Sequence, residues 1–489
     1  MTDRPETSRL AGAVQGSAVA AGLEPDAIGV TQDTIIGLAN VGPALTVGLT
    51  LAGLAAAAAY GGVTTILICL VPMLVIANAY RRLNLWNANC GASFEWVGRA
   101  INPYLGFFTG WLMIAANLLG NIAATVVLAP SLLAVFGDNA SSKWPNIFIA
   151  TAIIVIMTVI AIVGIRPTAR VQVGMAAVEY AILIGFAIVG LVAVLGHHHG
   201  TYPVTKGWFG ITGIGGHGSL ASGLLIAVFM FAGWDATVYV NEEVKHRRVN
   251  PGRAAIFAVG ILAIIYILSQ VGLQGVVSPG RLQKNSSSVL VYVARALGGS
   301  GWAKVMALAL ALSVAASVGI GIVSLSRISY GMATQRVLPV MLGRVNRRFA
   351  TPMIASIVMG VSIIVLTWIY LLSGPVANLF TQLISVDGLL YAAFYVLTAL
   401  AAIAYYWHRI FTSAWDALLV GLLPVGAIAF LAWIGVRSMQ TGTWQERWSL
   451  IGITVAGGLA MLAARFILRS SFFQTPRESA PPLETPSDR

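Results

Sequence analysis

Long apolar stretches alternate with short polar segments along almost the whole chain. A helix that crosses the hydrocarbon core of a bilayer needs about 20 consecutive, mostly apolar residues. Twelve stretches meet this requirement, near residues 31–57, 62–80, 104–136, 146–165, 171–195, 219–241, 254–277, 302–335, 353–373, 376–406, 415–437 and 447–468. The pattern therefore predicts an all-α membrane protein with twelve transmembrane helices.

Two of these stretches, the first and the sixth, are interrupted in the middle. The first contains Gly42-Pro43-Ala44, and a proline removes a backbone donor and clashes with the preceding turn. The sixth contains Gly233, which weakens an apolar run just before Trp234. The two lie five spans apart, an odd offset that inverts their topology. Paired interruptions of this kind indicate the binding site of a secondary transporter. The alternatives are a simple proline kink in the first span and a glycine that lets helices pack closely in the sixth.

The composition excludes a soluble protein. Of the 489 residues 58% are hydrophobic and only 9% are charged, whereas soluble domains carry about 25% charged residues. The formal net charge of +12 does not indicate nucleic acid here. With the N-terminus inside, about three quarters of the lysines and arginines fall on the cytoplasmic side, as the positive-inside rule requires. We expect a multi-pass protein of the cell membrane with both termini in the cytoplasm.

The two ends of the chain have a different composition from the apolar spans. Residues 1–26 are polar and unpatterned, which predicts a cytoplasmic tail and no cleavable signal. Residues 470–489 are rich in proline, serine and charge, which predicts a disordered cytoplasmic tail.

Three carboxylic acids lie inside predicted spans, namely Glu179, Asp235 and Asp387. An uncompensated ion at bilayer depth costs about 2.5–3.5 kcal/mol, so each should face a cavity or a partner rather than lipid. Desolvation disfavours a charged carboxylate, so Glu179 suits a proton carrier. The alternative role for Glu179 is structural: a protonated side chain that is hydrogen-bonded to neighbouring backbone. Asp387 precedes Gly388 and marks either a local irregularity or a polar contact near an aqueous vestibule, and its role stays open.

Other polar residues carry weaker signals. Ser313 and Ser317 lie four residues apart and therefore share one helix face. The run His197–His199 follows the fifth span and is interpreted as a loop, not a metal site. We find no arrangement typical of a hydrolase, a zinc protease or a redox enzyme. No enzyme activity, cofactor or metal is predicted.

Several motifs resemble the amino acid–polyamine–organocation (APC) superfamily of permeases, in its bacterial amino acid permease type. The segment from Phe229 to Asp235, with Glu242-Glu243-Val244-Lys245 after it, is similar to the sixth helix of that family. The pattern there is F-x-F-x-G-[aromatic]-[Asp/Glu], followed by E-E-[hydrophobic]-K. Residues 326–339 resemble its S-R-x-x-Y-x-M-A motif, and residues 345–352 and 164–170 resemble the starts of its ninth and fifth helices. The resemblance covers roughly residues 30–410.

This resemblance implies a LeuT-type fold that works by alternating access. The fold has two inverted repeats of five helices and two further C-terminal helices. Mapped on this chain, the first repeat spans 27–200, the second spans 201–410, and the extra helices span 411–469.

The resemblance also implies a substrate site at the sixth-helix break. In the family, carbonyls there accept the substrate amine, and they correspond here to those of Phe229, Phe231 and Ala232. Trp234 and Asp235 lie alongside and Gly233 gives room. Unwound carbonyls are free acceptors, and an aromatic ring attracts a cation.

In the first helix the family pattern is G-[Ser/Thr]-G, whose amides hold the substrate carboxylate. This chain has Gly42-Pro43-Ala44 instead, and Pro43 has no N–H. Ala44, Leu45 and Thr46 still offer amides. Glu179 falls where many members carry a lysine, so the charge sign is reversed.

We therefore expect a secondary active transporter, a symporter for an amino acid or a related amine, with Glu179 and Asp235 in proton coupling. Sodium coupling, an exchanger, a permease for carboxylate-free amines or polyamines, and a transporter-like sensor are the alternatives. The expected partners are the small-molecule substrate, protons and the lipid bilayer, with no nucleic acid. The sequence predicts no oligomeric state.

Overall fold

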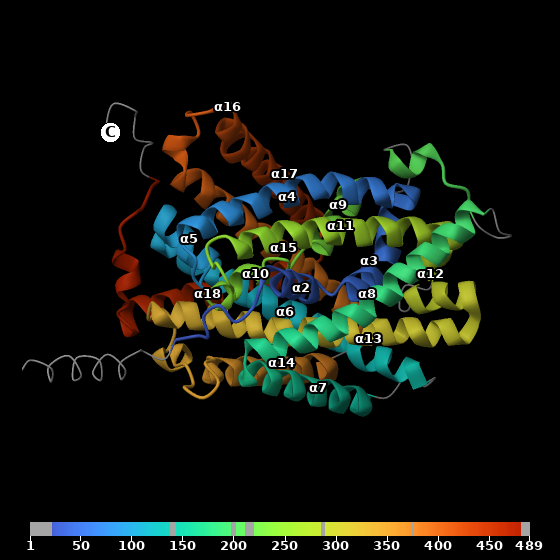
Figure 1. Ribbon diagram of the computed structural model, residues 1–489, viewed down its shortest axis with the longest axis horizontal. Coiled ribbons are helices and arrows are strands. Elements are labelled where there is room, and N and C mark those ends of the chain that lie inside the picture. Colours follow the sequence, from blue (N-terminus) through green and yellow to red (C-terminus); the bar gives the residue numbers. More distant parts are fainter. Residues whose placement is uncertain are drawn as a thin grey trace, which may run out of the picture.

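The computed structural model describes residues 22–136, 143–196, 202–210, 220–284, 289–373 and 376–480. Most of the helices run side by side along the long axis of the molecule (Figure 1). Eleven helices among the described residues are long and apolar enough to cross a membrane. These observations confirm an all-α membrane protein. The His197–His199 run lies outside the described residues.

The other ten predicted spans each correspond to a helix, although the one predicted at 302–335 begins already at Val289. They are α4 (Gly62–Trp86), α6 (Pro103–Phe136), α7 (Lys143–Val163), α8 (Ile165–Leu195), α11 (Asn250–Val276), α13 (Val289–Thr334), α14 (Met353–Ser373), α15 (Val376–Tyr405), α17 (Leu423–Thr441) and α18 (Trp444–Leu462). The helix α13 is kinked at Gly298 and Gly299. The expected sixth span begins with the short apolar helix α9 (Leu220–Met230) and holds no described helix long enough to cross a membrane, so the count of twelve stays a prediction.

The first span is broken at a single residue. The helix α2 (Val30–Val41) ends at Gly42, and α3 (Pro43–Ala58) begins directly after it. Gly42 has a φ of 63°, a left-handed conformation that glycine adopts without steric cost. Pro43 occupies the first position of α3, where the missing N–H has no intrahelical partner to lose. The Gly-Pro pair therefore produces the predicted interruption.

The break in the sixth span is longer. After α9 the chain turns through residues 231–235 and forms the short helix α10 (Ala236–Tyr239). Gly233 has a φ of 106°, which explains why a glycine stands in this turn. A short 3₁₀ helix, η4 (Asn241–Glu243), follows. Both interruptions that the sequence predicts are therefore present.

The two broken spans lie inside the bundle and the last helices lie outside it. In the apolar stretch of the first span 83% of the residues are buried, whereas the figure for the last span is 11%. The helices α8, α11 and α13 pack against the first broken span, and α4 and α15 pack against α9 of the second. The breaks are therefore shielded from lipid by other helices.

The C-terminal segment differs from the prediction of a disordered tail. Residues 471–474 form a 3₁₀ helix, η10 (Ser471–Gln474), and Phe472 is only 2% exposed. The ring of Phe472 stacks on Phe94 of α5 (Ser93–Ala100) at 4.4 Å between centroids. Glu478 binds Arg99 at 2.9 Å. The prediction of disorder is wrong for residues 470–480, because the rings of Phe472 and Phe473 are buried in the protein although the segment is polar on average.

Candidate functional site

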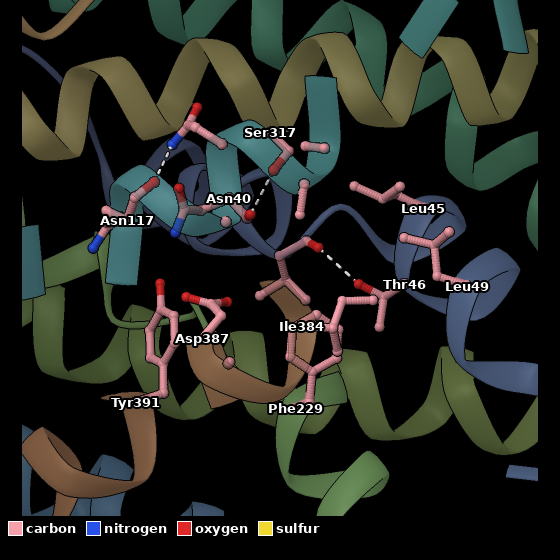
Figure 2. A pocket seen from close by; sticks show the side chains of 16 residues that line it. Asn40, Leu45, Thr46, Leu49, Asn117, Phe229, Ser317, Ile384, Asp387 and Tyr391 are labelled. Atoms are coloured by element: carbon pink, nitrogen blue, oxygen red, sulfur yellow. Dashed lines mark hydrogen bonds between the residues drawn. The ribbon is translucent and has the colours of Figure 1, made fainter. Parts of the chain in front are cut away.

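A polar cavity of about 60 Å³ lies between the two breaks. It is lined by α2 and α3, by α6, α13 and α15, and by the end of α9 with the turn after it (Figure 2). Its polar lining consists of Asn40, Thr46, Asn117, Asn121, Ser317, Asp387 and Tyr391. The cavity therefore joins elements from both halves of the chain.

Asn40 connects the two broken spans directly. Its side-chain amide donates to the carbonyl of Gly233 at 2.9 Å. A Cβ atom on Gly233 would lie 3.0 Å from that amide nitrogen, so a larger residue would crowd the contact. On the other side, the hydroxyl of Ser317 donates to the carbonyl of Asn40 at 2.9 Å. One residue thus fixes the end of α2 against both the turn at Gly233 and α13.

The amides at the start of α3 are all engaged by the protein. The N–H of Ala44 donates to Oε1 of Glu179 at 3.0 Å, and that of Leu45 donates to the Ser313 hydroxyl at 3.1 Å. The N–H of Thr46 donates to the carbonyl of Gly42 at 2.8 Å. The expectation that these amides stay open to a ligand is therefore wrong, because side chains from α8 and α13 cap the helix terminus.

Glu179 lies against the first break and not against lipid. The residue is fully buried, and the Ser313 hydroxyl is a second hydrogen-bond partner of its carboxylate. Its other oxygen, Oε2, has no partner among the described residues. Ser313 and Ser317 both contact the broken first span, which confirms that they share one helix face.

Asp235 is buried behind the second break and does not line the cavity. Its carboxylate accepts hydrogen bonds from the hydroxyls of Tyr239 and Tyr395, the latter at 3.0 Å. The ring of Trp234 packs between Tyr80 and Tyr395, at 5.0 and 5.4 Å between centroids. Tyrosines therefore satisfy this acid, and it faces a partner rather than lipid as expected.

Among the residues predicted for the sixth span, Phe229 and Ala232 line the cavity. The carbonyl of Phe229 accepts from the N–H of Ala232 at 2.9 Å. No described residue donates to the carbonyls of Phe231 and Ala232. Phe231 itself is fully buried against Tyr266. Two of the three predicted carbonyl acceptors thus lack a donor among the described residues, and of these two residues Ala232 lines the cavity.

Sequence reasoning missed the two asparagines of α6. Asn117 and Asn121 lie four residues apart in an otherwise apolar helix, so they share one face. That spacing is a signal that could have found them. Asp387, whose role the sequence left open, is 3% exposed in the cavity wall. Its Oδ1 has no hydrogen-bond partner among the described residues.

Known proteins resemble this chain in sequence. The sequence model described as amino acid permease matches residues 28–467. The vacuolar cationic amino acid transporter 4 of Arabidopsis thaliana is 24% identical over 343 residues, which is 66% of this chain and 52% of that protein. Asc-type amino acid transporter 1 of Homo sapiens is 24% identical over 296 residues, which is 57% of this chain and 53% of that protein. The chain spans about half the length of these relatives.

A solved structure shares the fold. The crystal structure of MhsT in complex with L-phenylalanine has a TM-score of 0.56 and is 16% identical. The alignment covers 85% of this chain and all of the other. The likeness supports the predicted LeuT-type fold.

Proposed function

Because this chain belongs to the amino acid permease family, we propose that it is a secondary active transporter that moves an amino acid or a related amine by alternating access. The observation that carries the proposal is the hydrogen bond from Asn40 to Gly233, which joins two broken helices beside a polar cavity. Broken helices at a repeat interface supply the ligand with unpaired backbone groups. The chemistry is binding and release, so this protein is not an enzyme.

The names of the relatives support an amine-bearing substrate. One is a cationic amino acid transporter, another is an Asc-type amino acid transporter, and the shared fold was solved with L-phenylalanine bound. In this chain the carbonyls of Phe231 and Ala232, to which no described residue donates, are acceptors suited to an ammonium group. Gly42 and Gly233 let a ligand approach the backbone at either break. The ring of Phe229 lies in the cavity wall and can contact the apolar part of the substrate.

We assign proton coupling to Glu179. Its carboxylate is fully buried at the first break, and its Oε2 has no partner among the described residues. Burial disfavours the charged form, so a change of exposure during the transport cycle changes the tendency to hold a proton. Asp235 is a second candidate, because it is equally buried beside the other break.

The proposed location is the cell membrane, with both chain termini in the cytoplasm. The bias of lysine and arginine toward one set of loops supports this orientation. In the proposed organisation, the inverted repeats span 27–200 and 201–410 and are followed by two further helices.

Counterflow in proteoliposomes tests the function directly. Vesicles loaded with unlabelled amino acid or amine should take up the labelled compound against its gradient. Separate pH and sodium gradients then identify the driving ion: accumulation should follow an inward proton gradient without sodium. An absence of exchange for every amino acid and amine tested would refute transport. Accumulation that follows sodium and ignores pH would refute the proton assignment.

A further inference from the structure

The carboxylate of Asp387 lies in the wall of the cavity, beside Tyr391 and near Asn40 (Figure 2). It is 3% exposed and its Oδ1 meets no donor among the described residues. We propose that Asp387 is the counter-ion of a small organic cation, and that the transported molecule needs no carboxylate. This inference rests on the proposed transport function and names the substrate class for the same cavity.

Several hydrogen-bond donors that line the cavity are already engaged by the protein. The hydroxyls of Thr46 and Ser317 already donate to the carbonyls of Val41 and Asn40. The amides of Asn117 and Asn121 each donate one of their two N–H groups to a carbonyl of their own helix.

Asp387 Oδ1 and Asn121 Oδ1 remain as buried acceptors without a donor among the described residues. A buried polar group without a partner is costly. An ammonium carries three donors, so one placed beside Asp387 would supply the hydrogen bond that its Oδ1 lacks.

The cavity also lacks a place for a carboxylate. No lysine, arginine or histidine is among the described residues that line it. The start of α3 offers no free donor: Pro43 has no N–H, and the amides of Ala44 and Leu45 bind Glu179 and Ser313. Glu179 thus occupies the amide that a substrate carboxylate would need. A ligand carboxylate would meet Asp387 instead, and like charges in a desolvated site repel each other.

The geometry around Asp387 keeps room for a ligand. The facing residue on α6 is Gly120, which has no side chain, and a Cβ atom there would lie in ordinary contact with Asp387 Oδ2 at 3.5 Å. The cavity of about 60 Å³ holds roughly four to six water-sized molecules. A ligand with a similar number of non-hydrogen atoms, such as ethanolamine or putrescine, fits this space.

The experiment compares matched ligands on the purified full chain in lipid nanodiscs. The pairs are serine with ethanolamine, ornithine with putrescine, and ethanolamine with its neutral analogue ethylene glycol. Dissociation constants come from calorimetry, and counterflow of each compound is measured in proteoliposomes. We expect loss of the carboxylate to leave affinity equal or better, whereas loss of the ammonium should weaken it by about a hundredfold or more, the effect of an unpaired buried charge.

Variants then locate the counter-ion. Asp387→Asn keeps the shape, and it should bind ethanolamine about a hundredfold more weakly and lose the preference for ethanolamine over ethylene glycol. Asp387→Glu should restore part of that preference. The matched control is Asp33→Asn on α2. Asp33 is another fully buried carboxylate that has no hydrogen-bond partner among the described residues, and it does not line the cavity. The control should keep the preference.

The outcomes separate this inference from the transport proposal. Exchange of serine or ornithine combined with no binding of their decarboxylated partners would overturn the inference and leave transport standing. An unchanged ligand preference in a folded Asp387→Asn protein would overturn it as well. The wild-type ligand series decides the carboxylate question even if that variant does not fold. If no compound of the panel binds or exchanges, the transport proposal fails and the inference fails with it.

Discussion

Arg327 and Glu243 form a two-pronged ion pair between fully buried side chains. Two nitrogens of the guanidinium each lie 3.0 Å from a carboxylate oxygen. Arg327 belongs to α13 and Glu243 to η4, so the pair ties the end of the broken sixth span to a long helix. The carbonyl of Glu243 also accepts from the N–H of Ala27 at 2.8 Å. The segments 242–245 and 326–339, which resemble two separate family motifs, therefore contact each other through this ion pair.

Removal of one member of this pair should destabilise the protein strongly. Arg327→Met leaves Glu243 buried without its partner, and such a change costs about 3–5 kcal/mol. The double variant Arg327→Met with Glu243→Leu removes both charges and should recover most of the loss. Unfolding in denaturant, followed in lipid nanodiscs, measures both variants. Equal stability of the single and double variants would contradict this view.

Glu179→Gln should separate binding from energy coupling. The amide oxygen of glutamine can still accept from the N–H of Ala44, so the first break should keep its geometry. The variant cannot release a proton. We expect substrate affinity within about threefold of wild type, with little or no accumulation under a pH gradient. Transport in proteoliposomes with a defined pH difference measures this. Normal accumulation by the variant would clear Glu179 of the role.

Gly42→Ala should lower stability. The φ of 63° is unfavourable for any residue with a Cβ, at about 1–2 kcal/mol. The new Cβ would also lie 3.2 Å from the Ser313 hydroxyl, which caps α3. Gly260→Ala in α11 is the control, because a Cβ there meets open space. It should be neutral or stabilise the helix by about 0.5–1 kcal/mol. A thermal melt of both variants tests the contrast, and equal shifts would count against it.

Asp235→Asn should weaken transport while the protein remains folded. Its carboxylate accepts from the hydroxyls of Tyr239 and Tyr395, and the Tyr395 hydroxyl in turn accepts from the N–H of Gly233 at 3.3 Å. Loss of the Asp235 charge should weaken these hydrogen bonds and make the turn at residues 231–235 less rigid. We expect initial uptake to fall by about tenfold, equivalent to about 1.4 kcal/mol. Tyr395→Phe, which removes one donor, should show a smaller loss. Uptake at the wild-type rate across pH would exclude Asp235 from the mechanism.

The sequence was sufficient to predict the breaks and the surrounding spans. Glycine with positive φ and proline at a helix start are local requirements, so Gly42, Pro43 and Gly233 mark their positions without tertiary information. Hydropathy similarly predicts spans, because the thickness of the bilayer sets the apolar length that a helix needs to cross it.

The contents of the cavity required the tertiary structure. Nothing local shows that Glu179 and Ser313 cap α3, since the contacts join residues 135 and 268 positions apart. Whether a described residue donates to Oδ1 of Asp387 likewise depends on which side chains surround it in the fold. The burial of Phe472 was also not predicted, because the C-terminal segment is polar on average and its two aromatic residues do not change that average.

The packed C-terminal segment gives the outermost helix a mechanical anchor. The helix α18 has few buried residues, so its own packing holds it only weakly to the bundle. The chain after it packs into the protein interior at Phe472 and Phe473. Glu478 and Ala480 add an ion pair to Arg99 and a backbone bond to Tyr405. A force applied at residue 480 must therefore extract two aromatic rings from the body of the bundle before it can draw out the last helix.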